Sequence, residues 1–126
     1  MDSVTVTLTL TPKREDLFNV FVTALEGGIG FWSECHRYKW SLPNGEYDHD
    51  GFVAEIEETE ADEPVRHTIN RDTIVKGLAH FAQPGTGYKH VRAAALALLT
   101  GNEADYDSEI ADCIVQAGLF GEVVYG

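Results

Sequence analysis

The sequence is poor in cysteine, in long apolar stretches and in basic residues. Its two cysteines, Cys35 and Cys113, are too few for a disulfide framework and predict free thiols. No apolar run approaches the roughly 18 residues that a membrane-spanning helix needs. The first residues carry neither a basic stretch nor a long apolar segment. We therefore expect no secretory signal and a cytoplasmic location.

The shortage of basic residues has the strongest functional consequence. Nine Lys and Arg stand against 21 Asp and Glu, which gives a formal net charge of −12. Such a chain repels phosphate groups, and this disfavours binding to nucleic acids and to anionic membrane surfaces. A small-molecule ligand or a basic partner protein remains compatible with this charge, and the sequence does not exclude a homo-oligomer.

The chain does contain enough apolar material for one core. Hydrophobic residues make up 44% of its 126 residues, an ordinary length and composition for one globular domain. No repeat, linker or low-complexity tract interrupts the pattern. We therefore treat residues 1–126 as a single domain.

Hydrophobic periodicity predicts an α+β fold. Period-two alternation indicates strands and period-3.6 spacing indicates helices, with Pro12, Asn70 and Ser108 at the expected helix starts. The pattern predicts strands over 3–11, 31–40, 51–58 and 65–69, a short strand over 122–125, and helices over 12–26, 71–82, 88–100 and 109–117. This order is typical of a small antiparallel sheet of three or four strands, with about four helices packed mainly on one face.

Residues 31–40 hold the most unusual pattern. Read as a regular strand, they place five side chains on one face: Trp32, Glu34, His36, Tyr38 and Trp40. Aromatic walls with a few polar groups are typical of a small-ligand pocket, in which a flat ligand stacks and Glu34 or His36 binds its edge. The alternative is that this face is core, with a bulge that ejects Glu34.

The turn Gly27-Gly28-Ile29-Gly30 adds Gly28 and Gly30 to the candidate ligand-binding residues, because a backbone nest there can hold an anion. This turn follows the end of a helix, however, and the dipole of a helix C-terminus repels anions. A plain helix stop with close packing is therefore the alternative.

Standard catalytic and metal motifs are missing. The histidines and cysteines lack CxxC or HExxH spacing, and the chain has no GxSxG elbow. Cys35 and His36 are neighbours on a predicted strand, so they point to opposite faces and cannot form a dyad. We expect no catalytic residue, no metal and no cofactor.

Acidic residues cluster in two places. The clusters comprise Glu55, Glu57, Glu58, Glu60, Asp62 and Glu63, and then Glu103, Asp105, Asp107 and Glu109. Such a surface can imitate the phosphates of DNA and occupy a basic site on another protein. The alternative is a solvated face that only aids solubility.

Two segments resemble motifs of small bacteriophage proteins without an assigned activity, including those of actinobacterial phages. Residues 24–32 (ALEGGIGFW) resemble an ALEGG-x-x-[YF]-W segment, and residues 119–126 (LFGEVVYG) resemble an LFGE-[VI]-VYG ending. We expect the two segments to lie close together and the ending to be ordered. Phe31 stands where these proteins often have Tyr, so a hydroxyl there is not required.

The resemblance implies a non-enzymatic accessory protein that acts in the cytoplasm of a bacterial host, with no catalytic residues to carry over. Together with the aromatic face, it favours a protein that binds a nucleotide-like or other flat ligand, to sequester a host signal or oppose host defence. The alternative is an acidic inhibitor of a host protein, including a DNA mimic.

Overall fold

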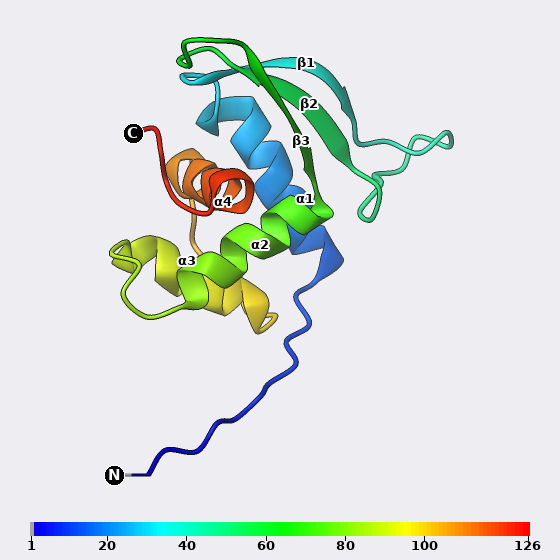
Figure 1. The fold of residues 1–126 in the computed structure, drawn as a ribbon. Helices are drawn as coiled ribbons and strands as arrows, with labels where there is room; N and C mark the ends of the chain where they lie inside the picture. Colours follow the sequence, from blue (N-terminus) through cyan, green and yellow to red (C-terminus); the bar gives the residue numbers. More distant parts are fainter. Residues whose placement is uncertain (1) are drawn as a thin grey trace.

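The computed structural model describes residues 2–126. Its elements are α1 (Arg14–Thr23), the π-helix η1 (Ala24–Gly28), β1 (Ser33–Lys39), β2 (Val53–Glu58), β3 (Val65–Asn70), α2 (Arg71–Ala82), α3 (Lys89–Leu99) and α4 (Ser108–Phe120). The strands form one antiparallel sheet in the order β1-β2-β3, and the helices lie mainly on one side of it (Figure 1). This confirms the predicted α+β fold.

The core lies between the sheet and the helices. Ala54 and Ile56 of β2 and Ile69 of β3 point into it and have no exposed surface. Leu17 and Phe21 of α1 are buried there, as the helical periodicity predicts. Among the described residues, none of the helices combines the length and the apolar character that crossing a membrane requires.

α4 occupies the middle of the helical layer. Residues 110–117 are buried without interruption, and the helix contacts η1 and α2. An ideal Cβ on Gly77 of α2 would lie 1.9 Å from the carbonyl oxygen of Ile114, and one on Gly118 of α4 would lie 2.0 Å from that of Thr73. The two helix backbones therefore touch at a pair of glycines.

Local capping determines where α2 and α4 begin. The Asn70 side chain accepts a hydrogen bond from the Thr73 backbone, and the Thr73 hydroxyl accepts one from the Asn70 backbone, which confirms the predicted N-cap. At α4 the cap is Asp107 rather than Ser108, because its carboxylate accepts a hydrogen bond from Ile110 N at 2.9 Å. α4 also runs three residues further than predicted, to Phe120.

Residues 2–11 do not join the sheet, so the predicted strand over 3–11 is wrong. Val4, Val6 and Leu8 are 86%, 74% and 74% exposed. Figure 1 shows this segment extending away from the folded body before α1 begins at Arg14. The alternation of apolar residues with threonines in this segment favours an extended backbone. A strand, however, also needs a neighbouring strand for its backbone hydrogen bonds. The ending over 122–125 is likewise not a strand.

Deletion of residues 2–9 is expected to change the free energy of unfolding by no more than about 0.5 kcal/mol, because their apolar side chains, Val4, Val6 and Leu8, are 74–86% exposed. Urea denaturation followed by circular dichroism measures this difference. A loss well above 1 kcal/mol on the same scale would mean that the segment packs on the domain.

Candidate functional site

A β-bulge interrupts β1 in the middle of the aromatic-rich segment. Cys35 pairs with Ile56, but Arg37 pairs with Glu55, the next residue of β2 in the antiparallel register. His36 is therefore an extra residue without a partner on β2. A bulge of this kind shifts the period-two alternation of the strand by one residue.

The shift divides the predicted ligand-binding face between the two sides of the sheet. Tyr38 pairs with Ala54, which points toward the helices, whereas Glu34 pairs with Glu57 on the outer side. The prediction that residues 32, 34, 36, 38 and 40 share one face is wrong for this reason. The bulge was part of the alternative interpretation, which also placed Glu34 outside the core.

Trp32 lies in the core, as that alternative held. It precedes β1 and has no exposed surface. Its indole N–H donates a hydrogen bond of 2.7 Å to Asp112 Oδ1, and its ring stacks on Tyr125 with centroids 5.2 Å apart. A residue enclosed in this way does not line an open pocket.

Tyr38 and Trp40 lie at a groove of about 600 Å³ beside the open edge of β1, which we call the β1 groove. Their rings are in contact, with centroids 4.4 Å apart, and Tyr38 is 59% exposed. The Trp40 ring meets Phe21 of the core edge-on at 6.1 Å. Leu25 of η1 also lines the groove and is partly buried. The groove thus has an aromatic wall anchored to the core.

Charged side chains complete the lining of the β1 groove. Arg37 and Lys39 of β1 are exposed, and Arg37 Nε lies 3.1 Å from Glu55 Oε2. Cys35 also lines the groove as a free thiol, and partial burial raises its pKa. A raised pKa keeps this sulfur protonated near neutral pH, which is the unreactive form.

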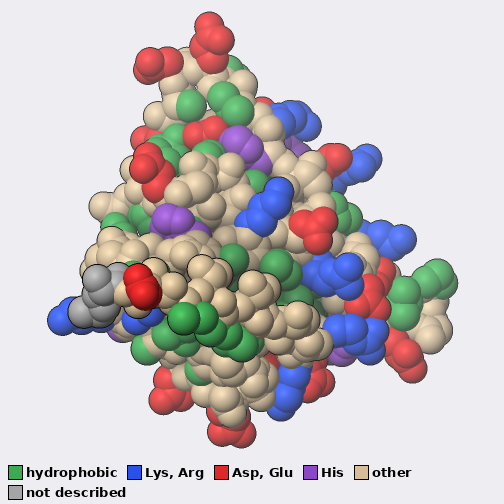
Figure 2. All heavy atoms as spheres, turned by 60° about the horizontal axis from the view of Figure 1, so that its bottom comes forward, with side chains coloured by type: hydrophobic (Ala, Val, Ile, Leu, Met, Phe, Trp, Pro, Cys, Tyr) green, Lys and Arg blue, Asp and Glu red, His purple; other side chains and the backbone are tan. Residues whose placement is uncertain are grey.

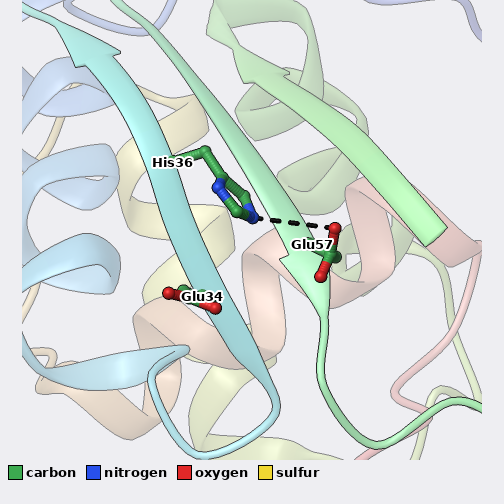
Figure 3. Close-up of side chains that lie close together, drawn as sticks. All are labelled: Glu34, His36 and Glu57. Atoms are coloured by element: carbon green, nitrogen blue, oxygen red, sulfur yellow. Dashed lines mark ion pairs between the residues drawn. The ribbon is translucent and has the colours of Figure 1, made fainter. Parts of the chain in front are cut away.

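Glu34, His36 and Glu57 come together on the outer face of the sheet, from β1 and β2 (Figure 3). His36 Nε2 lies 3.7 Å from Glu57 Oε1, and Arg66 Nε lies 3.5 Å from the same oxygen. One possible metal-ligating atom from each of the three residues lies within 4.8 Å of the other two. Spacing along the chain does not reveal this group, because it depends on the register between β1 and β2.

A second polar cluster ties the chain end to the sheet. The Tyr125 hydroxyl donates a hydrogen bond of 2.5 Å to Glu58 Oε1, and His67 Nε2 lies 2.7 Å from Glu58 Oε2. These two hydrogen bonds lower the pKa of the Glu58 carboxyl, and the hydrogen bond to Glu58 raises the pKa of Tyr125. Glu58 therefore holds the chain end and His67 on the sheet, although its position in an acidic cluster of the sequence predicts an exposed side chain.

Gln116 holds the last residues on α4. Its side-chain oxygen accepts hydrogen bonds from the backbones of Val124 and Tyr125, and its nitrogen donates to the Tyr125 carbonyl and to Asp112. Burial raises the pKa of Asp112, which the hydrogen bonds from Gln116 and Trp32 partly offset. The predicted packing of the chain end is thereby confirmed.

The two segments that carry the resemblance meet at a second cavity, of about 520 Å³. It lies between η1, the start of α4 and the chain end, and is lined in part by Gly27, Gly28, Val123 and Tyr125. The helix does not stop at Gly27 but continues as η1 to Gly28. An ideal Cβ on Gly28 would lie 2.6 Å from the carbonyl oxygen of Ser108, whereas one on Gly30 would contact nothing within 4 Å. Gly28 thus has a packing role.

The structure brings three of the predicted site residues to the β1 groove and places the other four outside it, although one of the three, His36, also lies beside Glu34. The three are His36, Tyr38 and Trp40. The others are Trp32 in the core, Glu34 on the outer face, Gly28 in η1 and Gly30 in the exposed turn that follows.

Comparison of the chain with protein-family models, with curated proteins and with solved structures finds no match.

Proposed function

We propose that this chain is a non-enzymatic binding protein whose β1 groove takes a small, flat ligand. The observation that carries the proposal is the contact pair Tyr38–Trp40, which presents an exposed aromatic surface within a concave site. The volume of about 600 Å³ falls in the usual range of small-molecule pockets. Trp40 is held by Phe21, so the aromatic surface is positioned before a ligand arrives.

An anionic group beside the flat part of the ligand would meet two cations at the groove, although Glu26 and Glu55 also line it and Glu55 already pairs with Arg37. Arg37 and Lys39 are two of only nine basic residues in a chain of net charge −12, and both line this groove. A nucleotide combines a base that stacks on Tyr38 with phosphates that these cations attract. In the phage setting that the resemblance implies, such a protein would sequester a nucleotide-like signal in the host cytoplasm or oppose host defence.

Replacement of Tyr38 by alanine is expected to weaken nucleotide binding by a factor between about 5 and about 150, since stacking contributes about 1–3 kcal/mol per base. We would titrate the protein with adenosine and guanosine mono-, di- and triphosphates and follow tryptophan fluorescence and calorimetric heat. Tyr47→Ala is the matched control, because Tyr47 is similarly exposed, at 63%, but lies outside the groove. We expect Tyr47→Ala to bind as the unaltered protein does.

Equal affinity of Tyr38→Ala and the unaltered protein would place the ligand elsewhere. An absence of binding to every nucleotide at millimolar concentration would remove the nucleotide class from the proposal. Stacking acts at short range, so the part of the affinity that depends on Tyr38 should change little between 0.1 M and 1 M salt, where the Debye length shrinks from about 10 Å to about 3 Å; only the attraction between phosphate and the exposed cations should weaken.

The acidic turn between β2 and β3 supports a second candidate, an inhibitor that binds a basic host protein. Glu60, Asp62 and Glu63 are exposed there. The acidic surface is smaller than the sequence suggests, because Glu55 pairs with Arg37 and Glu58 with His67. Figure 2 shows Lys and Arg side chains among the acidic ones along one side of the face it presents.

This candidate differs from the first in its response to salt and to charge removal. Capture of a basic host protein should disappear in a variant with Glu60, Asp62 and Glu63 changed to Gln or Asn, and should fail at high salt. Glu58 must stay unchanged in this variant, since it accepts the hydrogen bond of Tyr125.

A further inference from the structure

We propose that Glu34, His36 and Glu57 form a binding site for a divalent transition-metal ion, with Zn²⁺ as the best fit. The three candidate ligand atoms, one imidazole nitrogen and two carboxylate oxygens, already lie within 4.8 Å of one another. Around tetrahedral Zn²⁺, ligand atoms at about 2.0–2.2 Å from the metal are separated by about 3.4 Å. Small side-chain rotations therefore close the site, and the backbone of the two strands need not move.

The register of the sheet places two carboxylates opposite each other, an arrangement that favours a cation between them. Glu34 pairs directly with Glu57, and two like charges opposite each other destabilise an antiparallel pair. The bulge leaves His36 unpaired beside both carboxylates, as Figure 3 shows. A bound divalent ion would neutralise the two glutamates and convert their repulsion into shared coordination.

The donor set selects the class of metal. Mg²⁺ and Ca²⁺ prefer all-oxygen sites, whereas an imidazole with two carboxylates suits Zn²⁺ and neighbouring transition metals. Three protein ligands leave a coordination position for water or another ligand. The side chains of His36 and Glu57 retain 32% and 24% exposure, so an ion can reach them from solvent.

Arg66 is the group that competes with the ion. Its Nε lies 3.5 Å from Glu57 Oε1, the oxygen that also faces His36. Metal binding must displace this guanidinium, so Arg66 lowers the affinity of the site. This makes Arg66→Gln a variant that should strengthen metal binding, a result that no general loss of structure would produce.

The experiment titrates the full chain, prepared without a histidine tag and free of metal, with Zn²⁺ alone by calorimetry, and with Co²⁺ alone by visible absorption. We expect one Zn²⁺ per chain. Both His36→Ala and Glu34→Gln should weaken binding at least tenfold, and Arg66→Gln should strengthen it severalfold. Glu55→Gln is the matched control, because Glu55 lies two residues before Glu57 on β2, pairs with Arg37 and is outside the group.

Cys35→Ser distinguishes this site from binding through the neighbouring thiol. Cys35 pairs with Ile56 and points to the other side of the sheet, so this variant should bind Zn²⁺ as the unaltered protein does. The proposal is overturned if His36→Ala retains full affinity, if Cys35→Ser loses binding, or if the unaltered protein binds no Zn²⁺ at millimolar concentration. The proposal does not depend on a ligand in the β1 groove, because the metal is the only probe.

Discussion

Replacement of Gly77 by alanine is expected to lower the free energy of unfolding by more than about 3 kcal/mol, or to prevent folding. The new Cβ would lie 1.9 Å from the carbonyl oxygen of Ile114, which is backbone and cannot rotate away. Helix propensity alone predicts the opposite sign, since alanine in a helix is favoured over glycine by about 1 kcal/mol. The steric term is larger, because α2 and α4 would have to move apart.

Gly30→Ala is the matched control for this substitution. A Cβ at Gly30 would meet no heavy atom within 4 Å, and its backbone φ is not positive. We expect its free energy of unfolding to stay within about 0.5 kcal/mol of the unaltered protein. Urea denaturation of both variants measures the difference. A Gly77→Ala protein as stable as Gly30→Ala would show that α2 and α4 do not cross at this point.

Replacement of Trp32 by alanine is expected to destabilise the protein by about 3–5 kcal/mol, in the range of large aromatic truncations in cores. Trp32 has no exposed surface, stacks on Tyr125 and donates a hydrogen bond to Asp112. The substitution therefore removes apolar contacts and one of the donors to a buried carboxylate. The neighbouring Phe31 is 55% exposed, so Phe31→Ala should cost far less.

Trp32→Phe keeps most of the ring and removes only the N–H donor. Burial already raises the pKa of Asp112, and loss of the Trp32 hydrogen bond should raise it further. A carboxyl whose pKa is raised by folding destabilises the folded state as the pH rises through that pKa. The stability difference between Trp32→Phe and the unaltered protein should therefore be larger at pH 7 than at pH 4.

Chemical denaturation at these two pH values measures the effect. Asp112→Asn in the Trp32→Phe background is the control, since an amide does not titrate and should remove the added pH dependence. A stability difference that is the same at both pH values would show that the indole N–H does not stabilise the charged form of Asp112.

Short-range signals in the sequence predicted most of the helices and the three strands that form the sheet, although they also added residues 3–11 to it. Asn70 caps α2 through atoms three residues away, and the hairpin partners follow one another closely along the chain. Such features depend on neighbours in the sequence, so periodicity and capping chemistry reveal them. The same reasoning placed α3 within one residue of its observed bounds at each end.

The candidate site was harder to predict because it depends on one residue of register. Alternation along β1 assumes a regular strand, and the bulge at His36 moves Tyr38 and Trp40 away from Glu34. The grouping of Glu34 and His36 with Glu57 likewise requires the pairing of two strands. The spacing of residues along a single segment shows neither where a bulge lies nor which residues of two strands pair.

The sequence by itself determined the fold class, the secondary structure from Arg14 to Phe120 to within a few residues, and the strongly negative charge. Only the tertiary structure decided that Trp32 is core, that Glu58 binds Tyr125, and that residues 2–11 lie outside the sheet. The physical reason is the range of the interactions. Backbone propensity and capping act within a few residues, whereas burial, strand pairing and buried hydrogen bonds join residues far apart in the chain.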